Sequence, residues 1–332
     1  MQKQALRIEI VRSNFKSISS LSEKSALEIV AILSQHYSDV VMTNVDTITD
    51  MEALIERKPD LVFSGIYHVI DKITGAKVWL AAELEKNGIA HTGSSKMANR
   101  LSLNKNLAKQ QMLHHGIKTA AYKLASLSDL SAFDESGLNF PLFVKPNNKS
   151  GGQGIDEFSI VRTAEQLHSK VSSIHTRHTT DALVEEYLEG REFSIAVITD
   201  HKTNELIAMP IEIVPTEDGN GERMLGNIIK NLNIETSFMV EDTAEHQALS
   251  AFGVAAFQVL GGRNYGRIDV RLDGSGTIHF LEANLIPGLI GVDNYFPKAY
   301  RLNLGLQPEA MLLHIVHLAL NPEHKQLLTF EN

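Results

Sequence analysis

The sequence predicts an α/β unit at the N-terminus, followed by two α+β lobes that face each other. In roughly the first 95 residues, short apolar runs alternate with amphipathic helical stretches, which is the pattern of βαβ crossovers on a parallel sheet. From about residue 140 onward, short strands are joined by glycine-rich or polar turns. No internal repeat and no low-complexity segment interrupts this order.

The composition is that of an ordinary globular protein, and it excludes several kinds of site. The chain has 332 residues, 43% hydrophobic and 21% charged, enough to bury the cores of about two or three domains. A net charge of −9 without a long basic run argues against binding along a nucleic-acid backbone. The absence of cysteine excludes disulfides, thiolate metal sites and cysteine nucleophiles. No signal-peptide pattern and no apolar run of about 20 residues is found, so we expect a cytoplasmic protein without membrane contact.

The N-terminal unit begins with a buried strand at residues 6–11. Apolar or β-branched runs at 40–44 and 61–64 predict two further strands, and helical spacing predicts helices at 25–35 and 78–86. The turn sequence His91-Thr92-Gly93-Ser94 closes this unit.

The later part of the chain is predicted to contain shorter elements. Helices are expected at residues 104–115, 163–173, 244–260 and 309–320, the first of them ended by Gly116. Strands are expected at 140–146, 157–161, 182–187 and 193–199, and a strand pair at 266–284. The polar stretch 216–233 has no clear period and is long enough to form a mobile active-site loop.

The strand pair contains the first candidate site. Polar and apolar residues alternate before a strong turn signal at residues 273–276, which predicts two antiparallel strands with one buried face. If Leu272 pairs with Thr277, then Arg267 faces Glu282, and Asp269 becomes a diagonal neighbour of Glu282 on the same face.

These side chains suit a magnesium–phosphate site. Carboxylates and the amide oxygen of Asn284, further along the same face, are hard ligands for Mg²⁺, and Arg267 can neutralise charge on a phosphoryl group. A surface hairpin with a solvated ladder of ion pairs explains the pattern equally well. The opposite face is expected to be buried and consists of Ile268, Val270, Leu281 and Ala283.

Lysines and glycines form a second candidate site. Lys145 ends a hydrophobic strand next to the glycine-rich run 147–154, where an ammonium group can contact phosphate oxygens and the amides of Gly151 and Gly152 can cover them. The order GxxxxGK[ST] of a Walker P-loop is absent, and a flexible turn is the plainer explanation of such a run. Lys105 and Lys109 lie one helical turn apart, and taken alone they indicate a solvated helix face.

An acidic cluster follows the strand at 182–187. Glu185, Glu186 and Glu192 are explained either as an acidic strand end or as part of a nucleotide site, in which the backbone at 185–188 reads the adenine edge and Glu192 holds the ribose. Histidines are plentiful but lack a metal-binding pattern such as HExxH, so we do not expect a histidine metal site.

Taken together, the chain resembles the ATP-grasp superfamily, and specifically the D-alanine–D-alanine ligase family. The matching runs occur in the family's order over about 200 residues, which is more specific than any single run. They are His91-Thr92-Gly93-Ser94, Asn104-Lys105 with Lys109, Val144-Lys145-Pro146, the stretch 184–190 with Glu192-Phe193, the stretch 266–270, and Leu281-Glu282-Ala283-Asn284 with Pro287-Gly288. The resemblance implies an ATP-grasp fold divided into an N-terminal α/β domain at 1–97, a central lobe with the glycine-rich loop at 98–184, and a C-terminal lobe with the magnesium site at 185–332.

The resemblance also implies roles for individual residues. Lys105 and Lys145, with the loop glycines, would contact ATP phosphates, while Arg267 would stabilise the phosphoryl group in transfer. Lys230 is the candidate lysine of the mobile loop. Adenine and ribose would be held by Glu185, Glu186, Tyr187, Leu188 and Glu192, although Glu186 stands where the family usually has lysine. Magnesium, as one or two ions that Mn²⁺ can replace, would be held by Asp269, Glu282 and Asn284. A homodimer with small-molecule substrates is implied as well.

Departures from the family concentrate at the expected substrate positions. Ser20 stands where the family has a glutamate that receives the first substrate's ammonium group, and Gly151 and Gly152 replace a pair of serines. The family's histidine–glycine loop is reduced to a run containing His68, and the stretch 216–233 contains no tyrosine. After Gly288, Asp293 occurs in place of a serine-rich stretch that receives a carboxylate, and an aspartate is a poor neighbour for that group.

We therefore expect an ATP-dependent ligase that joins a carboxylic acid to an amine through an acyl phosphate, with substrates that differ from those of the family. The alternatives are a genuine D-alanine–D-alanine ligase, an intramolecular ligase that closes a ring, and a non-catalytic ATP-binding protein. A dinucleotide-dependent oxidoreductase is disfavoured because no GxGxxG turn follows the first strand.

Overall fold

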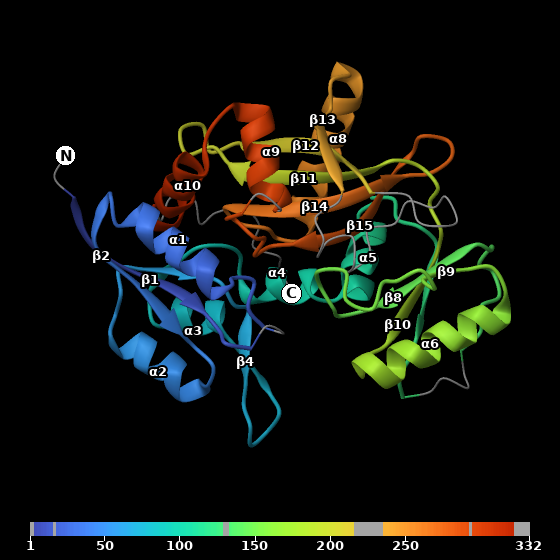
Figure 1. The fold of residues 1–332 in the computed structure, drawn as a ribbon, viewed down its shortest axis with the longest axis horizontal. Coiled ribbons are helices and arrows are strands. Elements are labelled where there is room, and N and C mark those ends of the chain that lie inside the picture. The colour runs from blue at the N-terminus through green and yellow to red at the C-terminus, as the bar shows by residue number, and fades with distance from the viewer. Residues whose placement is uncertain (1–2, 16–17, 129–132, 216–234, 292–293, 322–332) are drawn as a thin grey trace.

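The fold was obtained as a computed structural model, which describes residues 3–15, 18–128, 133–215, 235–291 and 294–321. Among the described residues the fold has three larger sheets, each with its own helices, and one two-stranded sheet (Figure 1). In that view the N-terminal unit is at the left, a smaller lobe is at the lower right, and the largest sheet crosses the upper part.

The N-terminal unit is a parallel sheet in the strand order β2-β1-β3-β6, which confirms the predicted βαβ arrangement. The helix α1 begins after Ser22, whose side chain accepts a hydrogen bond from the backbone N–H of Ser25, and it packs Ala26, Ile29 and Leu33 into the core. The elements of the N-terminal unit are β1 (Gln4–Arg12), α1 (Glu23–Leu33), β2 (Tyr37–Asn44), α2 (Ile48–Glu56), β3 (Leu61–Ser64), α3 (Leu80–Lys86) and β6 (Ala90–His91).

A hairpin interrupts this unit between β3 and α3. Its strands are β4 (His68–Ile70) and β5 (Lys77–Trp79), and it projects at the bottom of Figure 1. The prediction of a helix from residue 78 was wrong for its first two positions. Val78 and Trp79 are residue types that favour strands, Val78 pairs with Val69, and the Trp79 ring packs 5.2 Å from that of His68.

The smaller lobe is an antiparallel sheet in the order β7-β10-β8-β9, covered by one helix. The helix buries Leu167, Val171 and Ile174 against Val144 and Val184 of the sheet. The elements are β7 (Tyr122–Ala125), β8 (Leu142–Pro146), β9 (Ile160–Val161), α6 (Ala164–His178) and β10 (Ala182–Glu186).

The largest sheet is antiparallel, in the order β13-β12-β11-β14-β15, and it is covered on both faces. Alternate residues of β11 point to opposite sides: Ile195 and Val197 join the core under α8, whereas Ala196 and Ile198 join the core under α9 and α10. The elements are β11 (Glu192–Thr199), β12 (Leu206–Val214), β13 (Thr236–Met239), α8 (Thr243–Val259), β14 (Tyr265–Leu272), β15 (Ile278–Asn284), α9 (Tyr295–Leu304) and α10 (Pro308–Leu320).

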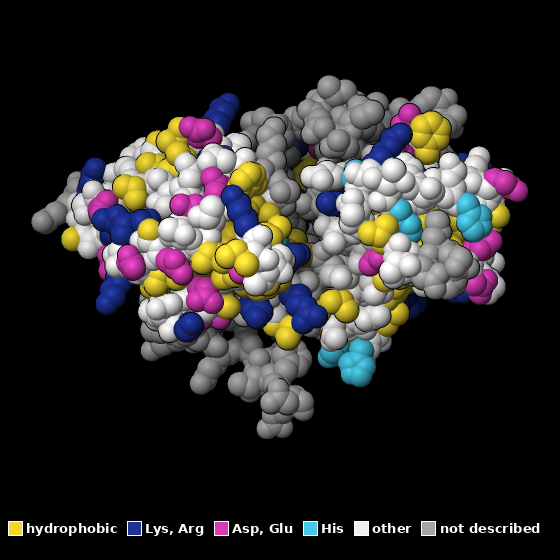
Figure 2. Space-filling view, turned by 90° about the horizontal axis from the view of Figure 1, so that it is seen from below, with side chains coloured by type: hydrophobic (Ala, Val, Ile, Leu, Met, Phe, Trp, Pro, Cys, Tyr) yellow, Lys and Arg dark blue, Asp and Glu magenta, His cyan; other side chains and the backbone are white. Residues whose placement is uncertain are grey.

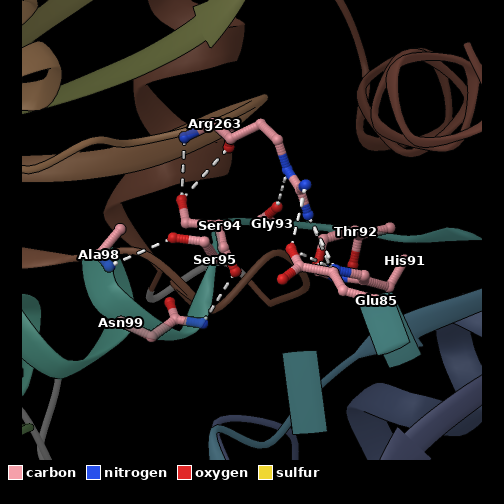
Figure 3. A network of polar contacts seen from close by, with 9 residues as sticks. All are labelled: Glu85, His91, Thr92, Gly93, Ser94, Ser95, Ala98, Asn99 and Arg263. Atoms are coloured by element: carbon pink, nitrogen blue, oxygen red, sulfur yellow. Dashed lines mark hydrogen bonds and ion pairs between the residues drawn. The ribbon is translucent and has the colours of Figure 1, made fainter. Parts of the chain in front are cut away.

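Two sets of contacts connect the N-terminal unit to the largest sheet. The helices α4 (Lys96–Ser102) and α5 (Lys105–His114) contact β15, and α10 packs on α1, so that one core includes Ile8 and Ile10 as well as Ile315. A polar network reinforces the junction (Figure 3): Arg263, between α8 and β14, donates to the Gly93 carbonyl at 2.9 Å and lies 2.9 Å from His91 Nε2 and 3.3 Å from Glu85. The Arg263 N–H also donates to the Ser94 hydroxyl at 2.9 Å.

Candidate active site

The strand pair β14–β15 places its polar side chains on one face, but in a different register from the prediction. Arg267 pairs with Asn284 and Asp269 pairs directly with Glu282, whereas a shift after Asp269 pairs Val270 with Phe280. Asp269 and Glu282 are therefore direct and not diagonal neighbours. The extra residue in β15 is Leu281, which lines the cleft described below, and the prediction that it is buried on the opposite face was wrong.

Asp269 is held by three hydrogen bonds. The Nε and Nη2 groups of Arg267 donate to its two oxygens at 3.0 and 2.8 Å, and the Ser194 hydroxyl on β11 donates to Oδ1 at 2.7 Å. Ser194 is opposite Asp269 in the sheet, so the contact follows from strand pairing. Sequence reasoning missed Ser194, because only the register of β11 against β14 brings it to this carboxylate.

The lysines meet two glutamates at the same site. Lys105, the first residue of α5, has its Nζ 3.2 Å from Glu282 Oε2. Lys145, near the end of β8, and Lys109 lie 2.5 and 2.8 Å from the two oxygens of Glu185 on β10. All three lysines are buried, so the solvated helix face considered for Lys105 and Lys109 is wrong.

Burial and charge shift the pKa values of this cluster in opposite directions. Burial lowers the pKa of Lys109 to about 8, against the attraction of Glu185. For Glu185, burial alone would raise the pKa, but the charges of Lys109 and Lys145 outweigh it and hold the pKa below its usual value. Burial likewise opposes the charged form of Lys145, yet Glu185 and Glu282 raise its pKa above the usual value. The cluster is thus a set of compensated charges at neutral pH.

A cleft opens between the smaller lobe and the largest sheet. Its walls combine apolar, aromatic and charged side chains, and they bring the residues predicted for adenine and ribose together with the carboxylates of the strand pair. Lining residues are Phe143, Lys145, Ile155, Glu185, Glu186, Tyr187, Leu188, Glu192, Asp269, Arg271, Leu281 and Glu282.

Glu186 and Glu192 each have a protein partner as well. The Glu186 carboxylate accepts hydrogen bonds from the backbone N–H and side-chain amide of Asn139 at 2.9 and 2.7 Å. Glu192 lies 3.5 Å from Nη1 of Arg271, whose Nη2 donates to the Tyr187 hydroxyl at 3.0 Å. Arg271 is a further cleft residue that the sequence did not single out.

The glycine-rich loop lies between β8 and β9. Gly151, Gly152 and Gly154 have φ values of +64°, +75° and +76°, which L side chains rarely adopt. At Gly154 a Cβ would also lie 2.5 Å from Cγ of Pro146. Lys170 of α6 donates to the Gly154 carbonyl at 3.0 Å, which fixes the end of the loop.

Ser20, His68 and Gly288 are the predicted substrate residues that the structure describes. The backbone N–H and hydroxyl of Ser20 both donate to the Gly65 carbonyl, at 2.8 and 3.1 Å. His68 is buried against Trp79, and burial, helped by the charge of Lys77, lowers its pKa to about 4. Gly288 approaches Asn294 so closely that a Cβ would lie 2.1 Å from the amide oxygen. Lys230 and Asp293 lie outside the described residues.

Tyr67 connects the N-terminal unit to this site and was not predicted as a site residue. Its hydroxyl donates to Asn284 Oδ1 at 3.0 Å and accepts from the backbone N–H of Ile286 at 3.1 Å. Burial raises the pKa of Tyr67 to about 12, so it acts as a neutral donor.

The donor set can be tested against the metal that the family implies. Asp269 and Glu282 offer hard oxygens from directly opposite positions, and the amide oxygen of Asn284 lies on the same face, so the residue types fit Mg²⁺. Within the described ranges, no three His, Cys, Asp or Glu side chains are grouped closely enough to hold a metal ion. On the face shown in Figure 2, the visible histidines lie in separate places.

Comparisons with known proteins agree with this architecture. The chain is similar to the D-alanine–D-alanine ligase of Bacillus anthracis solved with ATP, with a TM-score of 0.75, 19% identity, and 95% of this chain and 98% of that chain covered. For the ligase of Coxiella burnetii the TM-score is 0.69 at 16% identity, with 97% and 95% covered. At these identities the likeness defines the fold, which is the ATP-grasp fold.

The sequence comparisons narrow the class further. The family model "D-ala D-ala ligase C-terminus" matches residues 111–317. The D-alanine–D-alanine ligase of Glaesserella parasuis is 30% identical over 288 residues, 86% of this chain and 88% of that protein. That of Geobacter sulfurreducens is 30% identical over 206 residues, 62% of each. The chain belongs to the D-alanine–D-alanine ligase family, and it is an ATP-dependent enzyme that forms a carbon–nitrogen bond. Within the described part of the chain, no helix is both long and apolar enough to cross a membrane.

Proposed function

We propose that the protein joins the carboxylate of one small substrate to the amine of another, and that this pair is not two molecules of D-alanine. A carboxylate oxygen attacks the γ-phosphorus of ATP and ADP leaves, which gives an acyl phosphate. The amine then attacks the acyl carbon, an amide bond forms, and inorganic phosphate leaves. The observation that carries the proposal is the face on which Arg267, Asp269 and Glu282 lie together, next to Lys105.

The residues around the cleft suit separate tasks in this reaction. Lys105 and Lys145 would exchange their glutamate partners for phosphate oxygens, and the positive-φ glycines would let the backbone approach them. Leu188 and Tyr187 offer apolar and aromatic surface for the base, and Glu192 a carboxylate for the ribose. Arg267 would neutralise charge on the phosphoryl group.

Asp269, Glu282 and Asn284 would hold Mg²⁺, which when bound would neutralise phosphate charge. In the structure, Asp269 is paired with Arg267 and Glu282 with Lys105. Binding of ATP with its metal would therefore rearrange existing ion pairs within the site.

The expected substrate positions support a changed specificity. Where the family has a glutamate, Ser20 is neutral and already bonded to the Gly65 carbonyl, so it offers no anion to an ammonium group. His68 is uncharged at neutral pH, since its pKa is lowered to about 4. Asp293 in the second-substrate stretch favours a cationic or neutral group on the amine substrate.

A genuine D-alanine–D-alanine ligase is the second candidate. It is favoured by the relative named for that activity, with which this chain shares 30% identity over 288 residues.

Release of ADP from pairs of D- and L-amino acids and simple amines, with mass analysis of the products, distinguishes the two candidates. We expect turnover with a pair other than D-alanine alone, and loss of turnover in Arg267→Ala. Efficient formation of D-alanyl-D-alanine as the main product would establish the second candidate. Asp293→Ser in the same screen tests acceptor choice, and we expect it to improve acceptors that have a free carboxylate.

A further inference from the structure

Arg267 is held in place by more than its ion pair. Two of its donor groups are used by Asp269, and its guanidinium carbon lies 5.3 Å from the ring centroid of Tyr295, the first residue of α9. The side chain of Arg267 is 13% exposed and Tyr295 is 5% exposed, so the cation lies against an aromatic face with little water around it.

The Tyr295 ring is in turn held from its far end. Its hydroxyl donates a hydrogen bond to Glu235 Oε1 at 2.8 Å. Glu235 directly precedes β13, is 8% exposed, and among the described residues its Oε2 has no hydrogen-bond partner. A buried carboxylate of this kind fixes the phenol strongly, because the hydrogen bond to Tyr295 is charge-assisted.

We propose that Tyr295 and Glu235 are positioning residues for Arg267, an inference that depends on the proposed function of Arg267. The carboxylate of Asp269 fixes the guanidinium edge, and the Tyr295 ring fixes the guanidinium plane. Asp269 accepts from Nε and Nη2, which leaves Nη1 as the group that would donate to a phosphoryl oxygen in the proposed reaction. Glu235 keeps the ring, and so the plane, in one orientation.

Tyr295 and Glu235 connect the strand β14 to the helix α9 and to the start of the edge strand β13. Glu235 precedes the edge strand β13, Tyr295 starts the helix α9 that packs on that strand, and Arg267 is on β14. The orientation of Arg267 is thus set by packing between elements and not by the β14–β15 hairpin alone.

Four variants distinguish the contribution of the Tyr295 ring from those of the Tyr295 hydroxyl and the Glu235 charge. Tyr295→Leu removes the aromatic face, and we expect kcat to fall about tenfold while KM for ATP changes less than about twofold. Tyr295→Phe and Glu235→Ala leave the ring without its partner, and kcat should fall about two- to fivefold. Glu235→Gln still accepts the phenol hydrogen bond and is expected to restore most of the Glu235→Ala loss.

Two control variants match these changes. Lys298→Met removes the other cation near the Tyr295 ring, whose Nζ lies 5.8 Å from the centroid, without touching Arg267. Tyr300→Phe removes a buried phenol from the same helix that faces His314 instead. Both should leave kcat within about twofold of the wild type.

A double-mutant cycle and a crystal structure decide the inference. If Tyr295 acts through Arg267, Tyr295→Leu causes no further loss of kcat in an Arg267→Lys background. Losses that multiply, or a fall in kcat that only tracks thermal stability, overturn it. In crystals of Tyr295→Leu we expect the guanidinium to leave its wild-type position, and an unmoved Arg267 overturns the inference whatever the activity. Absence of turnover in the wild type with every substrate pair counts against the proposed function instead.

Discussion

Glu185 lies buried between Lys109 and Lys145, and this arrangement shows what single residues contribute to the site. The two cations allow a carboxylate to stay ionised without water. The ion pair with Glu185 also fixes Lys145 at the end of β8, where Lys145 lines the cleft. The neighbours of Lys145 in the sequence indicated a site residue. Lys105 and Lys109, in contrast, lie one helical turn apart, and such a pair of lysines is usually solvated. The partner of Lys109 lies 76 positions away on another element, so local pattern alone could not reveal its burial.

Replacing Lys109 should therefore lower the stability of the fold, although Lys109 does not line the cleft. Lys109→Met leaves Glu185 with one cation. We expect the free energy of unfolding to fall by about 3 kcal/mol or more, because breaking a buried ion pair leaves a buried charge that is not fully compensated. Urea denaturation measures this. Lys123→Met, at an exposed pair with Asp134, is the control and should leave the transition unchanged. A loss below about 1 kcal/mol for Lys109→Met would show that the pair contributes little.

His68 should make stability depend on pH. Its pKa is lowered to about 4 in the folded protein from 6.5, so between pH 6.5 and 4 the unfolded chain binds a proton that the folded chain does not. Stability from this residue is therefore constant above pH 6.5 and falls as the pH drops toward 4, by about 3 kcal/mol in all. His68→Phe should remove that part of the slope, measured by denaturation at a series of pH values. The exposed His114→Asn should leave it, and an unchanged slope in His68→Phe would contradict the expectation.

At the scale of elements, the strand pair shows what sequence can and cannot predict. The alternation of charged and apolar residues was enough to predict β14, β15 and the face shared by Arg267 and Asp269. It did not predict the shift between Asp269 and Val270, because an extra residue in a strand leaves no distinct sequence signal. That shift brings Asp269 directly opposite Glu282.

The loop between β8 and β9 allows a matched test of backbone strain. A Cβ at Gly151 would meet nothing within 4 Å, whereas at Gly154 it would meet Pro146, although both positions have positive φ. We expect Gly151→Ala to lower the free energy of unfolding by about 1 kcal/mol, and Gly154→Ala by about 1–2 kcal/mol more. Thermal or urea unfolding compares the two, and equal losses would mean that Pro146 yields without cost.

For the whole molecule, the order of motifs along the chain was more informative than any one of them. It predicted the ATP-grasp fold and many of the strands, but not β7, β12 or β13. It missed the hairpin β4–β5 and the helices α2, α4 and α9. It also missed the return of α10 onto the N-terminal sheet, because that contact joins segments about 300 residues apart through apolar surface with no distinctive pattern. The motifs that matched concern ATP use, so the sequence predicted ATP use in more detail than substrate choice.

Arg263 is the polar connection across that junction, and its loss should loosen it. Arg263→Ala removes the contacts with Gly93, His91 and Glu85, and we expect amide hydrogen exchange at residues 90–94 to become about tenfold faster, since local opening is no longer opposed by them. Arg301→Ala, on the exposed side of α9, is the control. Unchanged exchange at 90–94 would show that apolar packing alone holds the junction.

In the proposed reaction, this site activates a carboxylate by transferring the γ-phosphoryl group of ATP to it. The most direct measurement uses a carboxylate substrate labelled with ¹⁸O in both oxygens and mass analysis of the released phosphate. The account predicts one ¹⁸O atom in each phosphate and one in the amide product, because the substrate oxygen that attacks phosphorus leaves with it. Phosphate without ¹⁸O, formed at the rate of amide synthesis, would contradict the account.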